Sequence, residues 1–252
     1  MTGARGVQSG FVGILGGMGP LAGVDFAGKL VESTVTLMNV SCDQDHVPFV
    51  LWSQPQVPDR SAAALDPQAP DPFPMMMEGI RGLIRAGAKI IAVPCNTAHL
   101  WYSPLLKNST VPLLHIVDAA VSALKQKPSV RHVGVLGTNA TLSRSIYQSR
   151  LAAEGYRCIL PTNADWDNLV SPAITLVKQG KVKAALPLLD EALANLAERS
   201  AQVVILGCTE LPIVLEHSLL EERVATIDPT RALAEACVRW WISNMMAIRA
   251  AN

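Results

Sequence analysis

The chain has 252 residues, of which half are hydrophobic and 17% are charged, and its formal net charge is zero. This composition is typical of a globular protein with a substantial core and excludes a largely disordered chain. The balanced charge, without basic clusters, disfavours a nucleic-acid partner. The uncharged stretch 6–24 contains several glycines and a proline, which disfavours a membrane-spanning helix there.

The cysteines indicate the redox environment. They are few and widely spaced, and no Cys-x-x-Cys pair suggests a metal site or a redox disulfide. The five are Cys42, Cys95, Cys158, Cys208 and Cys237. We therefore expect reduced thiols, no metal and a cytoplasmic location. Residues Met1 to Gly10 are expected to form a loose leader outside the fold.

Apolar runs and turn residues predict alternating strands and helices in the first half of the chain. The predicted strands are Phe11–Leu15, Val47–Trp52, Lys89–Val93 and Pro112–Ile116. The predicted helices are Leu21–Met38, Met75–Ala86 and Ala98–Lys107.

The second half repeats this alternation. Its predicted strands are His132–Leu136, Arg157–Leu160, Gln202–Leu206 and Val224–Ile227. Its predicted helices are Leu142–Glu154, Pro172–Gln179 and Lys183–Ser200, and a last helix runs from Arg231 to about Ile248. Such alternation predicts an α/β protein with parallel sheets covered by helices.

A repeated signature indicates that the two halves are related. Gly13-Ile14-Leu15-Gly16-Gly17 opens the first half, and Gly134-Val135-Leu136-Gly137-Thr138 opens the second. We expect two lobes, with the last helix returning the chain to the first. Lobe 1 would comprise residues 11–117 and 225–252, and lobe 2 residues 118–224.

The glycine-rich turn at residues 16–20 has two interpretations beyond a simple tight turn. Gly17-Met18-Gly19-Pro20-Leu21-Ala22 formally fits a dinucleotide-binding pattern, but Ser53-Gln54 stands where an acidic residue is expected. We favour a turn whose backbone N–H groups hold a small anion, such as a carboxylate, at a helix start.

Two further strands end at a cysteine that is followed by small polar residues, in Pro94-Cys95-Asn96-Thr97 and Gly207-Cys208-Thr209-Glu210. Ligands of parallel sheets bind at the carboxyl ends of the strands, so both thiols would lie at the binding site. Backbone N–H groups at a helix start are expected to acidify such a thiol. The alternative for each is a buried inert thiol, which we expect for Cys42, Cys158 and Cys237.

With these motifs in order, the chain resembles the cofactor-independent aspartate/glutamate racemase superfamily, and within it the aspartate racemases. The similar segments are Gly16–Pro20, Asp43–His46, Pro58–Ser61, Pro94–His99, Leu114–Ile116 and Gly207–Glu210. The resemblance implies two Rossmann-like lobes related by a pseudo-twofold axis, an active site in the cleft between them, no cofactor and a homodimer.

The resemblance also implies an activity, the interconversion of L- and D-aspartate without pyridoxal phosphate. Cys95 and Cys208 would flank opposite faces of the substrate α-carbon. One would remove the α-proton as a thiolate while the other, as a thiol, delivers a proton to the opposite face.

Substrate contacts are implied as well. Arg60 and Lys178 would bind the carboxylates of an acidic amino acid. The other expected substrate-binding residues are Gly17, Met18, Asn96, Thr97, Thr138, Thr141 and Thr209. Simple helix capping is an alternative for Asn96, Thr97 and Thr209, and interaction with a helix C-terminus is an alternative for Lys178.

The histidines and one loop complete the expected site. We expect structural hydrogen bonds for His46 and His115 and a supporting role beside Cys95 for His99. The proline-rich stretch Asp66–Pro74 is expected to be a mobile loop that closes over the cleft.

Several other functions fit part of the pattern. The same fold could racemise glutamate or a broad range of amino acids. A cysteine hydrolase would use Cys95 as nucleophile with a histidine base, but this leaves Cys208 unexplained. A decarboxylase would be expected to keep one thiol of the two, and a non-catalytic amino-acid-binding module would use the same cleft without turnover.

Overall fold

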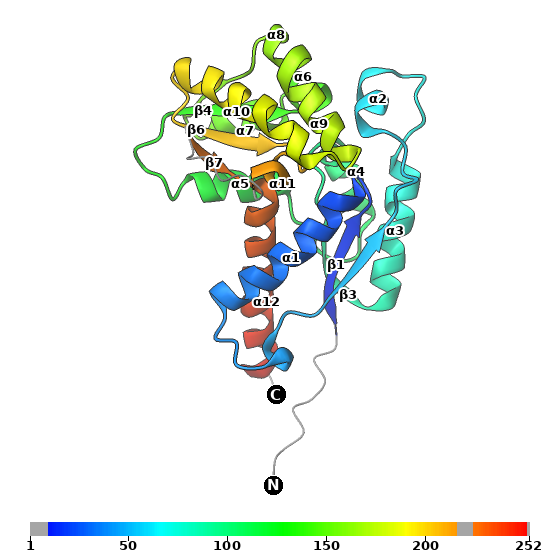
Figure 1. Ribbon diagram of the computed structural model, residues 1–252. Coiled ribbons are helices and arrows are strands. Elements are labelled where there is room, and N and C mark those ends of the chain that lie inside the picture. Colours follow the sequence, from blue (N-terminus) through cyan, green and yellow to red (C-terminus); the bar gives the residue numbers. More distant parts are fainter. Residues whose placement is uncertain (1–9, 216–223, 251–252) are drawn as a thin grey trace.

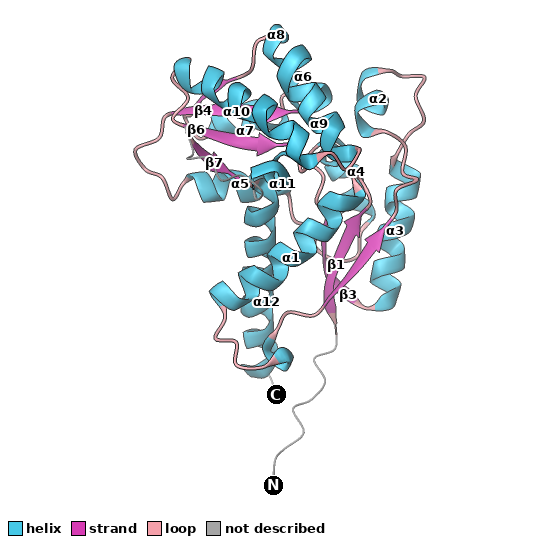
Figure 2. Ribbon diagram, viewed as in Figure 1, coloured by secondary structure: helices cyan, strands magenta, loops and turns pink. Residues whose placement is uncertain are grey.

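The computed structural model describes residues 10–215 and 224–250 (Figure 1). Of the expected leader Met1–Gly10, residues 1–9 lie outside this part of the chain. Two parallel β-sheets are covered by helices (Figure 2), which confirms the predicted α/β class.

The first sheet has the strand order β2-β1-β3. Its strands are β1 (Phe11–Gly16), β2 (Phe49–Ser53) and β3 (Ala88–Ala92). The helices of this half are α1 (Pro20–Leu37), η1 (Asp43–Asp45), α2 (Arg60–Leu65), α3 (Phe73–Ala86), η2 (Thr97–Trp101), α4 (Tyr102–Asn108) and α5 (Ile116–Leu124). The central strand β1 is apolar and almost wholly buried, as expected of a parallel strand covered on both faces.

The second sheet has the order β5-β4-β6-β7. Its strands are β4 (His132–Gly137), β5 (Arg157–Ile159), β6 (Val203–Gly207) and β7 (Ala225–Ile227). The helices of this half are α6 (Asn139–Ser143), α7 (Ile146–Ala153), α8 (Asn163–Asp165), η3 (Trp166–Val170), α9 (Ser171–Lys178), α10 (Val182–Glu198), α11 (Leu211–Leu215) and α12 (Pro229–Ala250). The strands β4, β5 and β6 take the places that β1, β2 and β3 hold in the first sheet.

The observed pairing bears on the expected lobe boundaries. Strand β7 pairs with β6, so residues 225–227 belong to the second sheet and not, as expected, to the first lobe. The chain returns to the first sheet with α12, which packs along α1. The other expected boundary, at residues 117 and 118, falls inside α5, which packs against both α12 and α7.

The predicted strand Pro112–Ile116 is wrong. Leu113 makes only an isolated bridge to Ile91 beside β3, and Ile116 already begins α5. The cause is local, because the side chain of His115 caps this helix by accepting the Val117 N–H at 3.2 Å. A β-branched pair after a capping histidine thus starts a helix instead of extending a strand.

The predicted helix Leu142–Glu154 is interrupted. It consists of α6 and α7, which are separated by Ser145 with a φ of 56°. A residue in this left-handed conformation cannot continue an α-helix. The break turns α7 so that Tyr147 is fully buried and reaches the first half of the chain.

One hydrophobic core joins the two sheets. It combines Ile14 of β1 and Val135 of β4 with side chains of α5 and α12, including the buried Trp241. Because close-packed interiors resist relative displacement, this shared core fixes one sheet against the other.

A buried ion cluster strengthens the same junction. Lys29 of α1 is almost fully buried and contacts Asp25 at 2.7 Å and Asp228 at 2.8 Å. It also donates to the Thr230 hydroxyl at 3.2 Å. Asp228 and Thr230 lie where β7 passes into α12, so the cluster joins α1 to the segment that leaves the second sheet.

We expect Lys29→Met to lower the free energy of unfolding by about 3–5 kcal/mol, because it removes the buried cation that pairs with Asp25 and Asp228. Urea unfolding followed by circular dichroism measures the change. Lys125→Met is the matched control, since Lys125 and Glu154 form an exposed pair at 2.8 Å whose loss costs at most about 1 kcal/mol. Equal stabilities of the two variants would contradict the role of the cluster.

Candidate active site

A narrow pocket lies where the carboxyl ends of the two sheets meet. The space within it and its mouth is about 300 Å³. It is lined by Met18, Asp59, Arg60, Ser61, Cys95, Asn96, Thr97, Thr138, Lys178, Cys208, Thr209 and Glu210. Cys95 follows a strand of the first sheet and Cys208 a strand of the second, so each half of the chain contributes one thiol.

Cys95 is held by the turn that leaves β3. The cysteine is 6% exposed, and its carbonyl lies 2.9 Å from His99 Nδ1. His99 Nε2 accepts the Ile116 N–H at 3.1 Å. Since that N–H can only donate, the ring proton is placed on Nδ1, where it donates to the Cys95 carbonyl, although the Leu114 carbonyl lies 3.4 Å from Nε2.

This hydrogen bonding determines what His99 can do. Burial, with a smaller contribution from His115, lowers the pKa of His99 to about 4, so the ring is neutral near pH 7. Both of its nitrogens are engaged with the backbone. His99 therefore positions the Cys95 turn and is not free to act as a base toward the thiol.

Cys208 directly follows β6 and is 5% exposed. Its Sγ donates to Glu210 Oε2 at 3.0 Å. Burial, followed by the neighbouring Glu210 carboxylate, raises the pKa of Cys208 well above its usual value, while Lys178 opposes the effect. The expected acidification is therefore wrong for Cys208, because burial and the hydrogen-bonded Glu210 carboxylate both disfavour the thiolate.

Two donors in the pocket have no partner among the residues that the structure describes. The side-chain oxygen of Asn96 accepts from the Tyr147 hydroxyl, but Asn96 Nδ2 is buried without a partner. Arg60 Nη1 donates to the carbonyls of Val57 and Pro58, both at 3.1 Å, whereas Arg60 Nε is buried without a partner. Because unsatisfied buried donors are costly, their presence indicates an anionic or carbonyl-bearing ligand.

Three hydroxyls connect the two halves of the pocket. Thr97 Oγ1 lies 3.0 Å from Thr138 Oγ1 and 3.0 Å from Thr141 Oγ1. Thr138 also caps α6 by accepting the Thr141 N–H. Thr97 and Thr138 line the pocket, while Thr141 hydrogen-bonds to both hydroxyls without itself lining it.

Gly17 and Lys178 are placed differently from the other expected contacts. Gly17 does not line the pocket. It has a φ of 93°, and a Cβ there would lie 2.3 Å from the Gln54 backbone nitrogen, so only glycine fits. Lys178 is exposed at the end of α9 and reaches the pocket rim.

A short helix over the pocket carries Arg60. Asp59 caps α2 by accepting the Ala62 N–H at 2.7 Å. From the other half of the chain, the Arg144 guanidinium donates to the Ala64 carbonyl, with Nε at 3.0 Å. The Arg144 hydrogen bond joins α2 to the end of α6, against which α2 packs. The expected mobile loop is shorter than predicted, because α3 begins at Phe73, and its closing movement stays a prediction.

The predicted site left out three residues that line the pocket, Asp59, Ser61 and Glu210. Asp59 and Ser61 flank Arg60, and Glu210 lies two residues after Cys208, so each stood inside a motif already singled out. Their closeness to Arg60 or Cys208 in the sequence could have identified them as candidates. Which of these side chains face the pocket, however, is evident only from the folded structure.

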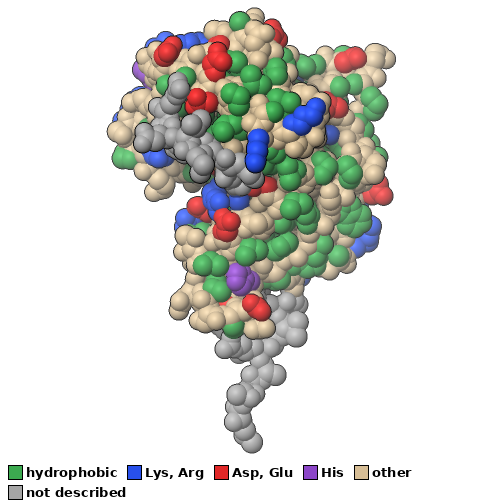
Figure 3. Space-filling view, viewed as in Figure 1, with side chains coloured by type: hydrophobic (Ala, Val, Ile, Leu, Met, Phe, Trp, Pro, Cys, Tyr) green, Lys and Arg blue, Asp and Glu red, His purple; other side chains and the backbone are tan. Residues whose placement is uncertain are grey.

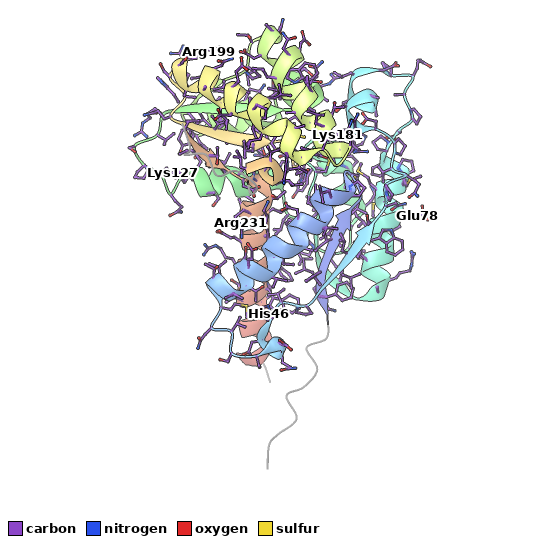
Figure 4. The ribbon with its side chains drawn as sticks, viewed as in Figure 1. His46, Glu78, Lys127, Lys181, Arg199 and Arg231 are labelled. Atoms are coloured by element: carbon purple, nitrogen blue, oxygen red, sulfur yellow. The ribbon has the colours of Figure 1, made fainter. Side chains whose placement is uncertain are left out.

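The remaining candidates lie outside the pocket. His115 caps α5, as expected of a structural histidine, and His46 lies at the far end of the molecule (Figure 4). Burial raises the pKa of Cys158 to about 11 and that of Cys237 to about 12, as expected of buried inert thiols. The expectation of a buried thiol is wrong for Cys42, which is exposed.

Comparisons with known proteins agree with the arrangement of the site. Residues 15–237 match the family model described as Asp/Glu/Hydantoin racemase. The broad specificity amino-acid racemase RacX of Bacillus subtilis is 29% identical over 92% of this chain and 98% of its own length.

Solved structures show the same fold. The aspartate racemase of Picrophilus torridus superposes with a TM-score of 0.78 and 32% identity, covering 92% of this chain and 94% of its own. A glutamate racemase of Francisella tularensis in complex with D-glutamate superposes with a TM-score of 0.68 at 17% identity, covering 94% of this chain and 82% of its own, and thus shows the fold alone. Within the described residues, no helix is both long and apolar enough to cross a bilayer. The chain belongs to the Asp/Glu/hydantoin racemase family and is an isomerase of the racemase class.

Proposed function

We propose that this racemase interconverts L- and D-aspartate, with Cys95 and Cys208 as the two proton-transferring groups and without pyridoxal phosphate. The observation that carries the proposal is the presence of two buried thiols, one from each sheet, in the same pocket. Inversion of a stereocentre requires a proton to leave one face and another to arrive at the opposite face. One thiol acts as thiolate and the other as thiol, so both must stay reduced, which agrees with a cytoplasmic location.

The polar groups of the pocket support an acidic amino acid as substrate. Asn96 Nδ2 and Arg60 Nε are donors without a partner in the described part of the chain, and Lys178 adds a positive charge at the rim. A carboxylate accepts from such donors, and donors fixed in advance stabilise the charge that develops when the α-proton leaves.

Glutamate or a broader set of amino acids is the second candidate. The similarity to RacX, named for broad specificity, extends over nearly the whole of that protein. The similarity to an aspartate racemase in both sequence and structure leads us to place aspartate first.

A cysteine hydrolase and a decarboxylase agree less well with the pocket. A hydrolase needs a free base beside Cys95, but both ring nitrogens of His99 are bonded to the backbone. Neither alternative gives a role to the second thiol.

Replacement of either pocket cysteine tests this function. The unaltered protein should form D-aspartate from L-aspartate faster than D-glutamate from L-glutamate, as measured by chiral chromatography. Cys95→Ser and Cys208→Ser should each lower racemisation by at least about 100-fold, because a serine hydroxyl is a much weaker acid than a thiol. Cys42→Ser, which changes an exposed thiol outside the pocket, should keep full activity. Full activity in either pocket variant would refute the two-thiol proposal.

Arg60→Ala should raise KM for aspartate by about 10- to 100-fold, the expected loss for a hydrogen-bonded carboxylate. Steady-state kinetics with aspartate and with alanine measures the effect, which should be larger for aspartate if Arg60 binds the side-chain carboxylate. Arg60→Lys should recover part of the loss, and the exposed Arg85→Ala serves as control. An unchanged KM for aspartate would remove Arg60 from the binding site.

We also propose that the protein is a homodimer that forms through α1 and β2. Helix α1 exposes Leu21, Val24, Val31 and Val35, and the edge strand β2 exposes Val50 and Trp52. The spacing of the four helix residues places them on one side of α1. Hydrophobic side chains extend over this face (Figure 3). An apolar stripe beside the edge strand β2, which pairs only with β1 within the described residues, matches the same stripe on a second copy around a twofold axis.

Val24→Asp should convert the dimer to a monomer, because a carboxylate would be buried at the centre of the interface. Val24 is 60% exposed in the single chain, so folding by circular dichroism should not change. Light scattering coupled to size-exclusion chromatography measures the mass, and Leu106→Asp on α4 is the control. The proposal fails if the unaltered protein is a monomer or if Val24→Asp remains a dimer.

A further inference from the structure

Glu210 is a buried carboxylate in direct contact with the thiol of Cys208, and the two-thiol reaction by itself assigns it no role. It is 4% exposed. Its Oε2 accepts from Cys208 Sγ at 3.0 Å and lies 3.4 Å from the Thr209 hydroxyl. Its Oε1 faces the start of α1, since a Cβ at Gly19 would lie 3.0 Å away. Burial of a carboxylate costs free energy, so one as enclosed as Glu210 would destabilise the fold without a compensating role.

The charged and titratable groups around the pair come from both halves of the chain. Lys178 of α9 and Arg60 of α2 are cationic, and Asp59 and Cys95 also line the pocket. Tyr147 of α7 is buried, and burial raises the pKa of its hydroxyl well above the usual value, so it stays protonated. The start of α1, through its helix dipole, favours one negative charge on Glu210.

A second negative charge is much harder to accommodate. If Cys208 lost its proton to water, a thiolate would stand 3.0 Å from a carboxylate. Repulsion at that distance in a buried site disfavours the double anion, as it does for paired carboxylates. Yet the two-thiol reaction requires Cys208 to be a thiolate whenever it acts as the base.

We propose that Glu210 is the proton acceptor for Cys208. The Cys208 S–H bond breaks and an O–H bond forms on Glu210 Oε2, while the electron pair of the S–H bond stays on sulfur. The negative charge moves from oxygen to sulfur, so the net charge of the pair does not change. The inference rests on the proposed function only for the use of this thiolate, since the proton-sharing pair itself is a property of the structure.

The pair then alternates between one proton and two during catalysis. With one proton, the thiolate form removes the substrate α-proton, which gives a thiol beside a carboxylic acid. In the opposite direction, that thiol delivers its proton to the carbanion, and the remaining proton returns from Glu210 to sulfur. The double anion never forms in either direction.

Glu210→Gln tests the proposal because it keeps an acceptor oxygen for the thiol and removes the basic carboxylate. We expect kcat/KM for aspartate near neutral pH to fall at least about tenfold, within the range of general-base effects. It should then rise with pH relative to the unaltered enzyme, since the thiol can lose its proton only to water. The two enantiomers have equal free energies in water, so both directions must lose kcat/KM equally. Glu78→Gln, on the outer side of α3 (Figure 4), removes the same charge far from the pocket and should change neither quantity.

Two results would overturn the proposal. Neutral-pH activity that is unchanged or increased in Glu210→Gln would mean that the carboxylate only hinders thiolate formation. Lower activity with an unchanged pH profile would mean that Glu210 has only a structural role.

A second measurement needs no turnover and separates this proposal from the proposed function. Carbamidomethylation of Cys208 by iodoacetamide is followed against pH by mass spectrometry, without substrate. Its midpoint should move to lower pH by about one unit or more in Glu210→Gln, because a neighbouring negative charge has gone. An unmoved midpoint overturns the coupling of the pair whatever the substrate is. If the midpoint moves but the unaltered protein racemises no acidic amino acid, the pair stands and the proposed function fails.

Discussion

The meeting of two parallel sheets at their carboxyl ends is the constraint on which the rest of the structure depends. Each sheet delivers one cysteine just beyond the carboxyl end of a strand, Cys95 after β3 and Cys208 after β6. Two thiols can serve one carbon atom only if the sheets do not shift against each other. The shared core and the buried Lys29 cluster fix the sheets at a distance from the pocket, while the Thr97, Thr138 and Thr141 hydroxyls join them beside it. Packing across the whole fold thus holds the two thiols in a fixed relative position.

The two cysteines have different surroundings despite their matching places in the fold. The backbone at Cys95 is anchored by a neutral histidine, whereas Cys208 shares a hydrogen bond with a buried carboxylate. Burial makes each added charge costly. Cationic side chains of the pocket offset this cost, and in the proposed mechanism the Cys208–Glu210 pair keeps its net charge constant. The proposed role of Glu210 therefore follows from the same burial that makes Cys208 a poor acid.

Sequence patterns predicted the features that depend on local chemistry. The glycine-ended strands β1 and β4 and the strand-to-cysteine motifs indicated the α/β class, the pairing of two halves and the position of both thiols. Features that depend on tertiary contacts were missed. The His115 cap turned an expected strand into α5, the left-handed Ser145 divided an expected helix, and the inward turn of Glu210 reversed the expected effect on the Cys208 thiol. The roles of the pocket residues toward a substrate remain predictions, because they require the ligand itself.

The central claim, proton transfer by two groups on opposite faces, is tested most directly by early turnover of L-aspartate in D₂O. Chiral separation followed by mass spectrometry gives the deuterium content of each enantiomer. The two-thiol account predicts that nearly every new D-aspartate molecule carries deuterium at the α-carbon, while the remaining L-aspartate keeps its protium. Protium retained in the D-aspartate product, or deuterium entering L-aspartate before D-aspartate accumulates, would indicate a single base and contradict the account.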